Sequence, residues 1–171
     1  MGLAEQLDYH HAPPNPFQRG VQRFASTRAG AWTFSKSLRH LDRAVSRLTG
    51  GRTSAPRLLA GLPVLRLTTT GRKSGQPRDT FLISVPVGDT LALLGTNFGQ
   101  PSTPAWVLNL EAEPRARVVH RGRVLDVVAR PADEAERATV VANAAGIYGG
   151  YLKYQERITT RRLRIFVLDP A

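Results

Sequence analysis

Apolar and polar positions alternate with a period of two over much of the chain after Gly61, a pattern typical of β-strands with one buried face. Short polar turns at Gly88-Asp89 and Arg121-Gly122 favour two hairpins of neighbouring antiparallel strands. The expected strands are Val64–Thr69, Thr80–Val87, Leu91–Leu94, Arg117–His120, Val124–Ala129 and Leu163–Leu168.

A period near 3.6 residues replaces this alternation from Trp32 to Leu48 and predicts a helix that ends at Gly50-Gly51. Its two faces differ sharply, with Phe34, Leu38, Leu41, Val45 and Leu48 on one and Lys36, Arg39, Arg43 and Arg47 on the other. Such a basic amphipathic helix either packs its apolar face on the domain or lies on an anionic bilayer.

Three further helices are expected between the strands. One is capped by Ser102 or Thr103, has Pro104 in its first turn and runs to Glu111, and the others span Asp133–Ala145 and Tyr148–Glu156. Hairpins interrupted by helices predict an α+β fold, a small barrel of mainly antiparallel strands with flanking helices. Residues 1–28 show no clear period, so we expect an irregular basic arm before a single domain over residues 29–171.

The distribution of charge along the chain indicates the kind of partner that the protein binds. The chain has 171 residues and a net charge of +11, and between Tyr9 and Arg78 it has thirteen lysines and arginines but only one acid, Asp42. This asymmetry indicates an anionic partner, either nucleic acid, a membrane surface or a phosphorylated cofactor. The absence of cysteine excludes disulfides, zinc–thiolate sites and thiol nucleophiles. No signal peptide or membrane span is apparent, so a cytoplasmic location is expected.

The first candidate site is the loop TTTGRKSGQPR, residues 68–78, between two expected strands. Its glycines allow a turn whose N–H groups face inward and form a concavity for oxyanions. Arg72, Lys73 and Arg78 add positive charge, and arginine can bind a phosphate through two parallel hydrogen bonds. The loop matches neither a Walker loop nor a GxGxxG motif, which disfavours ATP and Rossmann-bound NAD.

Two more motifs follow along the chain. GTNFG, residues 95–99, ends a strand shortly before the helical segment PAWVLNL and exposes backbone donors beside a helix N-terminus. Tyr148, Tyr151 and Tyr154 follow at spacings of three and would share one helix face, where three phenols are costly to bury without partners. His10, His11, His40 and His120 show no metal-ligand spacing, so no metal is expected.

These three motifs, in this order and spacing, resemble the deazaflavin-dependent nitroreductase and quinone reductase family over about residues 58–171. The basic helix is also typical of one branch. The resemblance implies a split β-barrel fold and the deazaflavin coenzyme F(420), whose tail carries a phosphate and several glutamates. Thr96 stands where relatives often have serine, a hydroxyl with a candidate role in protonating the substrate.

The resemblance also implies residue roles. The phosphate and tail would be held by Arg72, Lys73, Ser74, Gly75, Pro77, Arg78 and Thr80. The deazaflavin ring would lie beside Gly95, Thr96, Asn97, Phe98 and Gly99 and be flanked by Ala105, Trp106 and Asn109. Tyr148, Tyr151, Tyr154 and Thr96 are the candidate catalytic residues at the acceptor.

The implied reaction is hydride transfer from the reduced deazaflavin to an electron-poor acceptor, a quinone first, with nitroaromatics or enones as incidental substrates. Two alternatives stay open. FMN could occupy a similar barrel, and a basic module could bind a membrane or nucleic acid without catalysis. Nucleic acid is not expected, because aromatic residues are not interleaved with the basic ones. Peripheral contact with an anionic membrane remains compatible with the basic helix.

Overall fold

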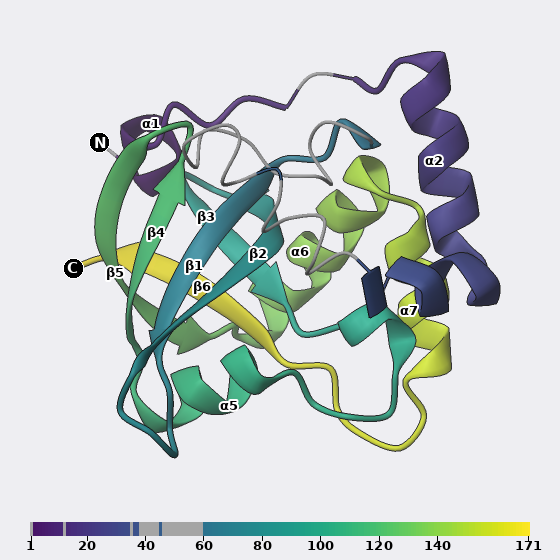
Figure 1. Cartoon of the computed structure of the whole chain (residues 1–171). Helices are drawn as coiled ribbons and strands as arrows, with labels where there is room; N and C mark the ends of the chain where they lie inside the picture. Colours follow the sequence, from purple (N-terminus) through teal and green to yellow (C-terminus); the bar gives the residue numbers. More distant parts are fainter. Residues whose placement is uncertain (1, 12, 35, 38–44, 46–59) are drawn as a thin grey trace.

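The computed structural model describes residues 2–11, 13–34, 36–37, 45 and 60–171. Its strands are Val64–Thr70 (β1), Pro77–Val87 (β2), Thr90–Leu94 (β3), Arg115–His120 (β4), Arg123–Pro131 (β5) and Ile165–Pro170 (β6). They form a closed antiparallel barrel in the order β1-β2-β3-β6-β5-β4, with β4 paired back to β1 (Figure 1). The predicted α+β barrel is therefore confirmed, and each predicted strand is present with its ends shifted by a few residues.

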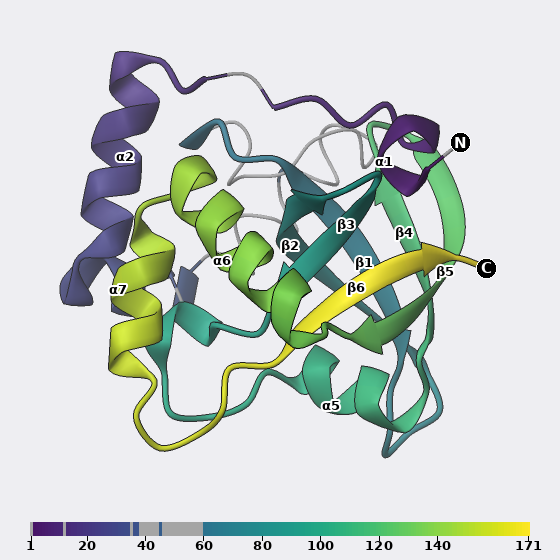
Figure 2. The same ribbon diagram turned by 180° about the vertical axis from the view of Figure 1, so that it is seen from behind.

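Both faces of β3 and β6 are buried, which explains their nearly continuous apolar sequences. Leu91, Leu93, Phe166 and Leu168 belong to one core cluster together with residues of α5 (Ala105–Ala112), and their neighbours along the strands belong to a second cluster. That second cluster includes residues of α6 (Glu134–Ile147) and α7 (Gly150–Arg157). Figure 2 shows these two helices beside the barrel, with α2 (Pro16–Ser26) as the outermost layer.

The N-terminal segment differs from the irregular arm that the sequence predicted. It contains α1 (Leu3–Gln6) and α2. Helix α2 begins with a capping box in which the Asn15 side chain accepts from the Gln18 N–H and the Gln18 side chain accepts from the Asn15 N–H. The largest apolar side chains of α2, Phe17 and Phe24, are exposed, which hid its helical period. The predicted helix from Trp32 to Leu48 lies mostly outside the described residues, although residues 28–34 and 36–37 are helical.

Helix α1 closes one end of the barrel, opposite α5 (Figure 1). Leu3 and Leu7 are fully buried in the same cluster as the strand leucines, and the Ala4 N–H donates to Asp89 at the β2–β3 turn. The Tyr9 hydroxyl donates to the Ser84 carbonyl of β2 at 2.9 Å. Residues 2–9 are thus integral to the barrel.

This placement gives a stability prediction. Leu7→Ala should lower the free energy of unfolding by about 2–5 kcal/mol, because it leaves a cavity in a packed core. Phe17→Ala, at a side chain 68% exposed, is the matched control and should change it by less than about 0.5 kcal/mol. Urea unfolding followed by circular dichroism measures both. Equal stability of the two variants would show that the barrel does not need its N-terminal closure.

Candidate functional site

A cleft of about 1020 Å³ lies between the β1–β2 side of the barrel and helices α2 and α7. That volume is at the upper end of the roughly 300–1,000 Å³ typical of ligand pockets. Of the residues predicted from sequence, the structure brings together in its lining Pro77, Arg78, Thr80, Thr96, Asn97, Phe98, Ala105, Trp106, Tyr148, Tyr151 and Tyr154. Residues from all three sequence motifs therefore meet in one site.

The cationic loop does not form the backbone anion cradle that the sequence predicted. Five of its N–H groups are used inside the protein: those of Gly71, Ser74, Gly75 and Gln76 donate within the loop, and that of Arg72 donates to the Asn109 side chain. An anion here would therefore rely on side chains rather than on these N–H groups.

Of the predicted loop cations, only Arg78 reaches the cleft lining, and its Nη2 donates to the Ser74 hydroxyl at 3.3 Å. Arg72, Lys73, Ser74 and Gly75 lie on the exposed turn outside that lining.

Asn109 is not in the lining either, because its side chain is committed to the loop. It is buried, accepts from the Arg72 N–H at 3.1 Å and donates to the Thr69 hydroxyl at 3.0 Å. These bonds join α5, β1 and the loop. Asn109 is thus a positioning residue for the cationic loop, and the structure does not place it beside a ring in the cleft.

The segment after β3 is held in an unusual backbone conformation. Asn97 and Phe98 have φ values of +46° and +56°, a left-handed region that is uncommon for residues other than glycine. Asn97 stabilises the turn by donating from Nδ2 to the Ser102 carbonyl and hydroxyl, both at 3.0 Å. Ser102 is consequently not the helix cap that the sequence predicted. Pro104 occupies that position and offers no side-chain acceptor.

Gly95 and Gly99 lie where a side chain would collide with neighbouring residues. At Gly99, with φ of +76°, a Cβ would lie 3.1 Å from Arg157 side-chain atoms, and at Gly95 it would lie 2.9 Å from Val107. Both glycines therefore allow close packing behind the cleft. Neither belongs to its lining.

Arg161 braces the same segment and was missed by sequence reasoning. Its guanidinium donates to the carbonyls of Gly95 at 2.9 Å, Thr96 at 3.0 Å and Gln100 at 3.3 Å. Burial, with a smaller effect from nearby Arg164, lowers the pKa of Arg161. Nothing in the sequence distinguishes this arginine from its neighbours, because all three of its partners are backbone atoms.

The N-terminus of α5 opens onto the cleft through Thr103, Pro104, Ala105 and Trp106. The first N–H groups of a helix have no intrahelical acceptor, and at α5 no side chain accepts from them. The Val107 N–H donates to the Pro104 carbonyl at 3.2 Å, which leaves the N–H groups of Ala105 and Trp106 for an anionic or carbonyl oxygen of a ligand. The Trp106 ring itself is buried and meets Phe166 edge-on, with ring centroids 6.0 Å apart.

Tyr148, Tyr151 and Tyr154 are equally spaced in the sequence, but their hydroxyl groups make different hydrogen bonds. The Tyr154 hydroxyl donates to the Ala25 carbonyl at 2.7 Å, so in its 2.9 Å contact with Tyr148 it must accept and Tyr148 must donate. Both protons are thereby used. The Tyr151 hydroxyl has no hydrogen-bond partner among the described residues, although its ring is 7% exposed in the cleft lining. Tyr151 alone of the three is free to donate to a ligand.

Burial is also the main cause of raised pKa values in this cluster. It raises the pKa of Tyr151 well above that of an ordinary phenol, with smaller contributions from Tyr9 and Tyr154. Burial raises the pKa of Tyr148 and Tyr154 in the same direction. All three phenols therefore stay protonated at neutral pH.

Sequence reasoning also missed the part of the lining that comes from other elements. Arg66 on β1 lines the cleft beside Asp79, with 3.6 Å between charged atoms, and α2 contributes Val21, Gln22 and Ala25. Arg66 could have been found as a cation among the apolar residues that begin β1. The α2 residues could not, because that helix itself was not predicted.

The described part of the chain was searched for a metal site and for a membrane-spanning helix. Among those residues, no group of three histidines, acids or cysteines is placed to hold a metal ion. None of the described helices combines the length and apolar character needed to cross a bilayer.

Comparison with known proteins identifies a family and related sequences. Residues 36–170 match the family model described as F(420)H(2)-dependent quinone reductase. A quinone reductase of that name from Mycobacterium tuberculosis is 32% identical over 135 residues, which cover 77% of this chain and 89% of that protein.

Solved structures with a similar fold were also found. An F(420)-H(2)-dependent reductase is 32% identical with a TM-score of 0.57, over 63% of this chain and 94% of that one. A further structure, described as a domain-swapped dimer, is 28% identical with a TM-score of 0.60, over 74% and 95% of the two chains. The barrel, the cleft and these relatives lead to one conclusion: the chain belongs to the F(420)H(2)-dependent quinone reductase family.

Proposed function

We propose that this protein transfers a hydride from the reduced deazaflavin coenzyme F(420) to a quinone, with nitroaromatics and activated enones as incidental acceptors. The observation that carries this proposal is the composition of one cleft, which combines the cation Arg78, the open N-terminus of α5 and the free phenol of Tyr151. The match to the family over residues 36–170 supports the same reaction.

The residues present fit the coenzyme. When bound, it supplies a hydride at carbon 5, which is two electrons and one proton, so the protein needs no redox group of its own. Arg78, with Arg72 and Lys73 on the neighbouring turn, would hold the phosphate and the glutamate tail. The segment from Thr96 to Phe98, with Ala105 and Trp106, would border the ring. Asn109 and Arg161 would act indirectly by fixing the loop and this segment.

Completion of the reaction requires one more proton, because a quinone becomes a hydroquinone by gaining a hydride and a proton. Tyr151 can supply it from its free hydroxyl and recover it from solvent. The buried Thr96 hydroxyl is a second candidate donor in the lining. Tyr148 and Tyr154 would instead shape the acceptor wall, since their protons are already used.

A binding and turnover assay tests this proposal. Tryptophan fluorescence should be quenched by F(420) at low micromolar concentration, with FMN and an oligonucleotide binding much more weakly. Reduced F(420) with 1,4-naphthoquinone should then regain the absorbance of the oxidised deazaflavin. Equal affinity for FMN, or no oxidation with any quinone or nitro compound, would contradict the proposal.

We also propose reversible contact with an anionic membrane surface, from which a lipid-soluble quinone could enter. The support is α2, which exposes Phe17 and Phe24 seven residues apart and carries Arg19 and Arg23. Each cation near an anionic leaflet contributes about 1 kcal/mol. Co-sedimentation with vesicles should therefore require anionic lipid, weaken at high salt and decrease in the Arg19→Gln/Arg23→Gln variant. Equal sedimentation with neutral vesicles would contradict it.

A further inference from the structure

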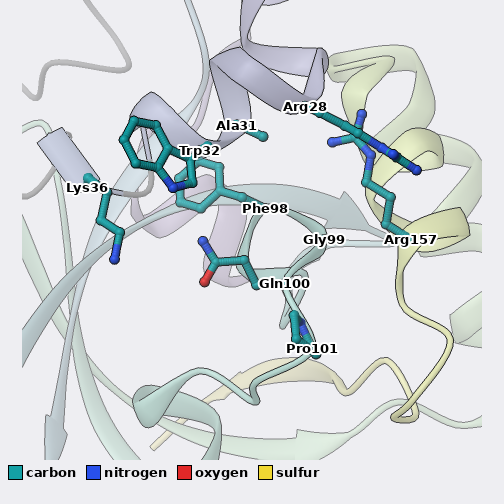
Figure 3. A pocket seen from close by; sticks show the side chains of 9 residues that line it. All are labelled: Arg28, Ala31, Trp32, Lys36, Phe98, Gly99, Gln100, Pro101 and Arg157. Atoms are coloured by element: carbon teal, nitrogen blue, oxygen red, sulfur yellow. The ribbon is translucent and has the colours of Figure 1, made fainter.

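A second pocket, of about 500 Å³, adjoins the cleft on the side of the N-terminal segment. Figure 3 shows Arg28 and Arg157 on one side of it and Trp32 and Lys36 on the other, with the Gln100 side chain between them. The rest of its lining consists of Ala31, Phe98, Gly99 and Pro101. Of these lining residues, only Phe98 has a role in the function proposed above.

The pocket concentrates positive charge without a compensating acid. Its lining contains Arg28, Lys36 and Arg157 and no carboxylate, and none of the ion pairs between described residues includes any of the three. Barrel arginines behave differently: Arg117 and Arg130, for example, pair with carboxylates at 2.7–2.8 Å. Within the described part of the chain these three cations have no acidic partner, and such a concentration of positive charge around one concavity favours an anionic occupant.

The cations differ in how firmly they are held. Arg157 donates from Nη2 to the Ser26 carbonyl at 2.8 Å and lies over the Tyr154 ring at 5.7 Å, so it is fixed between α7 and α2. Arg28 and Lys36 are exposed at the rim. An anion entering the pocket would therefore meet one preplaced guanidinium and two side chains that can close on it.

The pocket and the cleft are continuous, since Lys36, Phe98 and Gln100 line both. The Phe98 backbone has a left-handed conformation, and its ring packs edge-on against Tyr154, with 6.0 Å between ring centroids. Trp32, 65% exposed, offers a second aromatic surface at the pocket. One molecule can thus place an aromatic ring in the cleft and a charged group in the pocket.

We propose that this pocket binds the anionic substituent (a carboxylate, sulfonate or phosphate) of an aromatic acceptor whose ring occupies the cleft. The inference rests on the proposed function, because it assigns an acceptor class to the same reaction. It goes beyond that function in predicting a preference among quinones that is set by charge. Arg28 and Lys36 recognise the substituent, and Arg157 provides the fixed guanidinium.

Steady-state kinetics with two acceptors tests the assignment. We compare 1,4-naphthoquinone with 1,4-naphthoquinone-2-sulfonate, each across the same set of variants, so that their different reduction potentials cancel. Arg28→Gln should raise KM for the sulfonate by about tenfold, as expected for loss of a charge-assisted contact, and leave KM for the uncharged quinone within about twofold. Arg162→Gln is the matched control: it removes an exposed arginine that lines neither the cleft nor the pocket.

A binding measurement separates failure of the inference from failure of the proposed function. Without cofactor, 1,4-naphthoquinone-2-sulfonate should quench tryptophan fluorescence in a salt-sensitive manner, and Arg28→Gln or Trp32→Phe should reduce that quenching. This result stands even if no quinone is turned over, which would overturn the proposed reaction alone. An unchanged sulfonate KM and unchanged quenching in Arg28→Gln would overturn the inference. A shift of the F(420) Kd with unchanged acceptor preference would also overturn it, by assigning the pocket to the cofactor tail.

Discussion

Tyr151→Phe should lower quinone turnover by about a hundredfold or more and leave F(420) affinity within about threefold. General acids typically contribute factors of about 10²–10⁴, and Tyr151 has the one hydroxyl of the three clustered tyrosines that is not already donating to protein. Phenylalanine retains the ring and its packing, so the loss falls on proton donation or on hydrogen bonding to the acceptor. Stopped-flow oxidation of reduced F(420) measures the rate, and fluorescence quenching measures the affinity.

The neighbouring tyrosines are the matched controls. Tyr154→Phe leaves the Ala25 carbonyl without its donor and the Tyr148 hydroxyl without its acceptor, so it should lower the free energy of unfolding by about 1–3 kcal/mol. Its effect on turnover should be smaller than that of Tyr151→Phe. If Tyr151→Phe turns over quinone at the wild-type rate, the proton comes from solvent or Thr96 and the assigned role is wrong.

The pH dependence gives an independent check on the same residue. A general acid works in its protonated form, and burial raises the pKa of Tyr151 above that of an ordinary phenol. Activity that depends on this proton should therefore persist up to and beyond about pH 10, where an exposed tyrosine would be half ionised. A fall in kcat with a midpoint near the ordinary phenol pKa would place the donor elsewhere or in a wetter site.

Arg78→Ala should weaken F(420) binding about ten- to a hundredfold while the fold is retained. The guanidinium lines the cleft, and a charge-assisted hydrogen bond contributes about 1.5–3 kcal/mol. Lys73→Ala should weaken binding in the same direction but less, because Lys73 lies on the exposed turn outside the lining.

Arg115→Ala is the control for net charge. Arg115 is exposed, pairs with Glu113 at 3.0 Å and does not line the cleft. Fluorescence titration at low and high salt measures all three variants, and the difference between Arg78→Ala and wild type should narrow as salt screens the contact. Wild-type affinity in both Arg78→Ala and Lys73→Ala would show that the loop is only a surface turn.

The part of the site that could be predicted consists of residues that belong to a recognisable local sequence motif. Strand alternation and turn residues place the barrel, and the cationic loop, the GTNFG segment and the tyrosines stand out as motifs. The unpredictable part depends on distant backbone atoms. Tyr154 differs from Tyr151 because its partner is the Ala25 carbonyl, 129 residues earlier in the chain. No local pattern reports such a contact.

The same reason explains the errors at the loop and at α2. Glycines and cations correctly indicate a turn between strands, but which N–H groups remain free depends on how the turn closes, and here Asn109 and the loop carbonyls take them. In α2 the cap Asn15 with Gln18 was a readable helix signal. The helical period itself is obscured because Phe17 and Phe24 face outward rather than toward the core.

The site draws on two parts of the chain, one before and one inside the region that the family model matches. That match begins at residue 36, so Gln22 and Ala25 in the cleft and Arg28 and Trp32 in the pocket precede it. Arg78, Thr96 and Tyr151 lie within it. Substitutions at Gln22, Arg28 or Trp32, unlike those at the buried Leu3 and Leu7, are thus expected to alter which oxidant enters without disturbing the electron donor. An enzyme arranged in this way can diversify its substrates through the segment that begins at α2, while α1 and the catalytic barrel are kept.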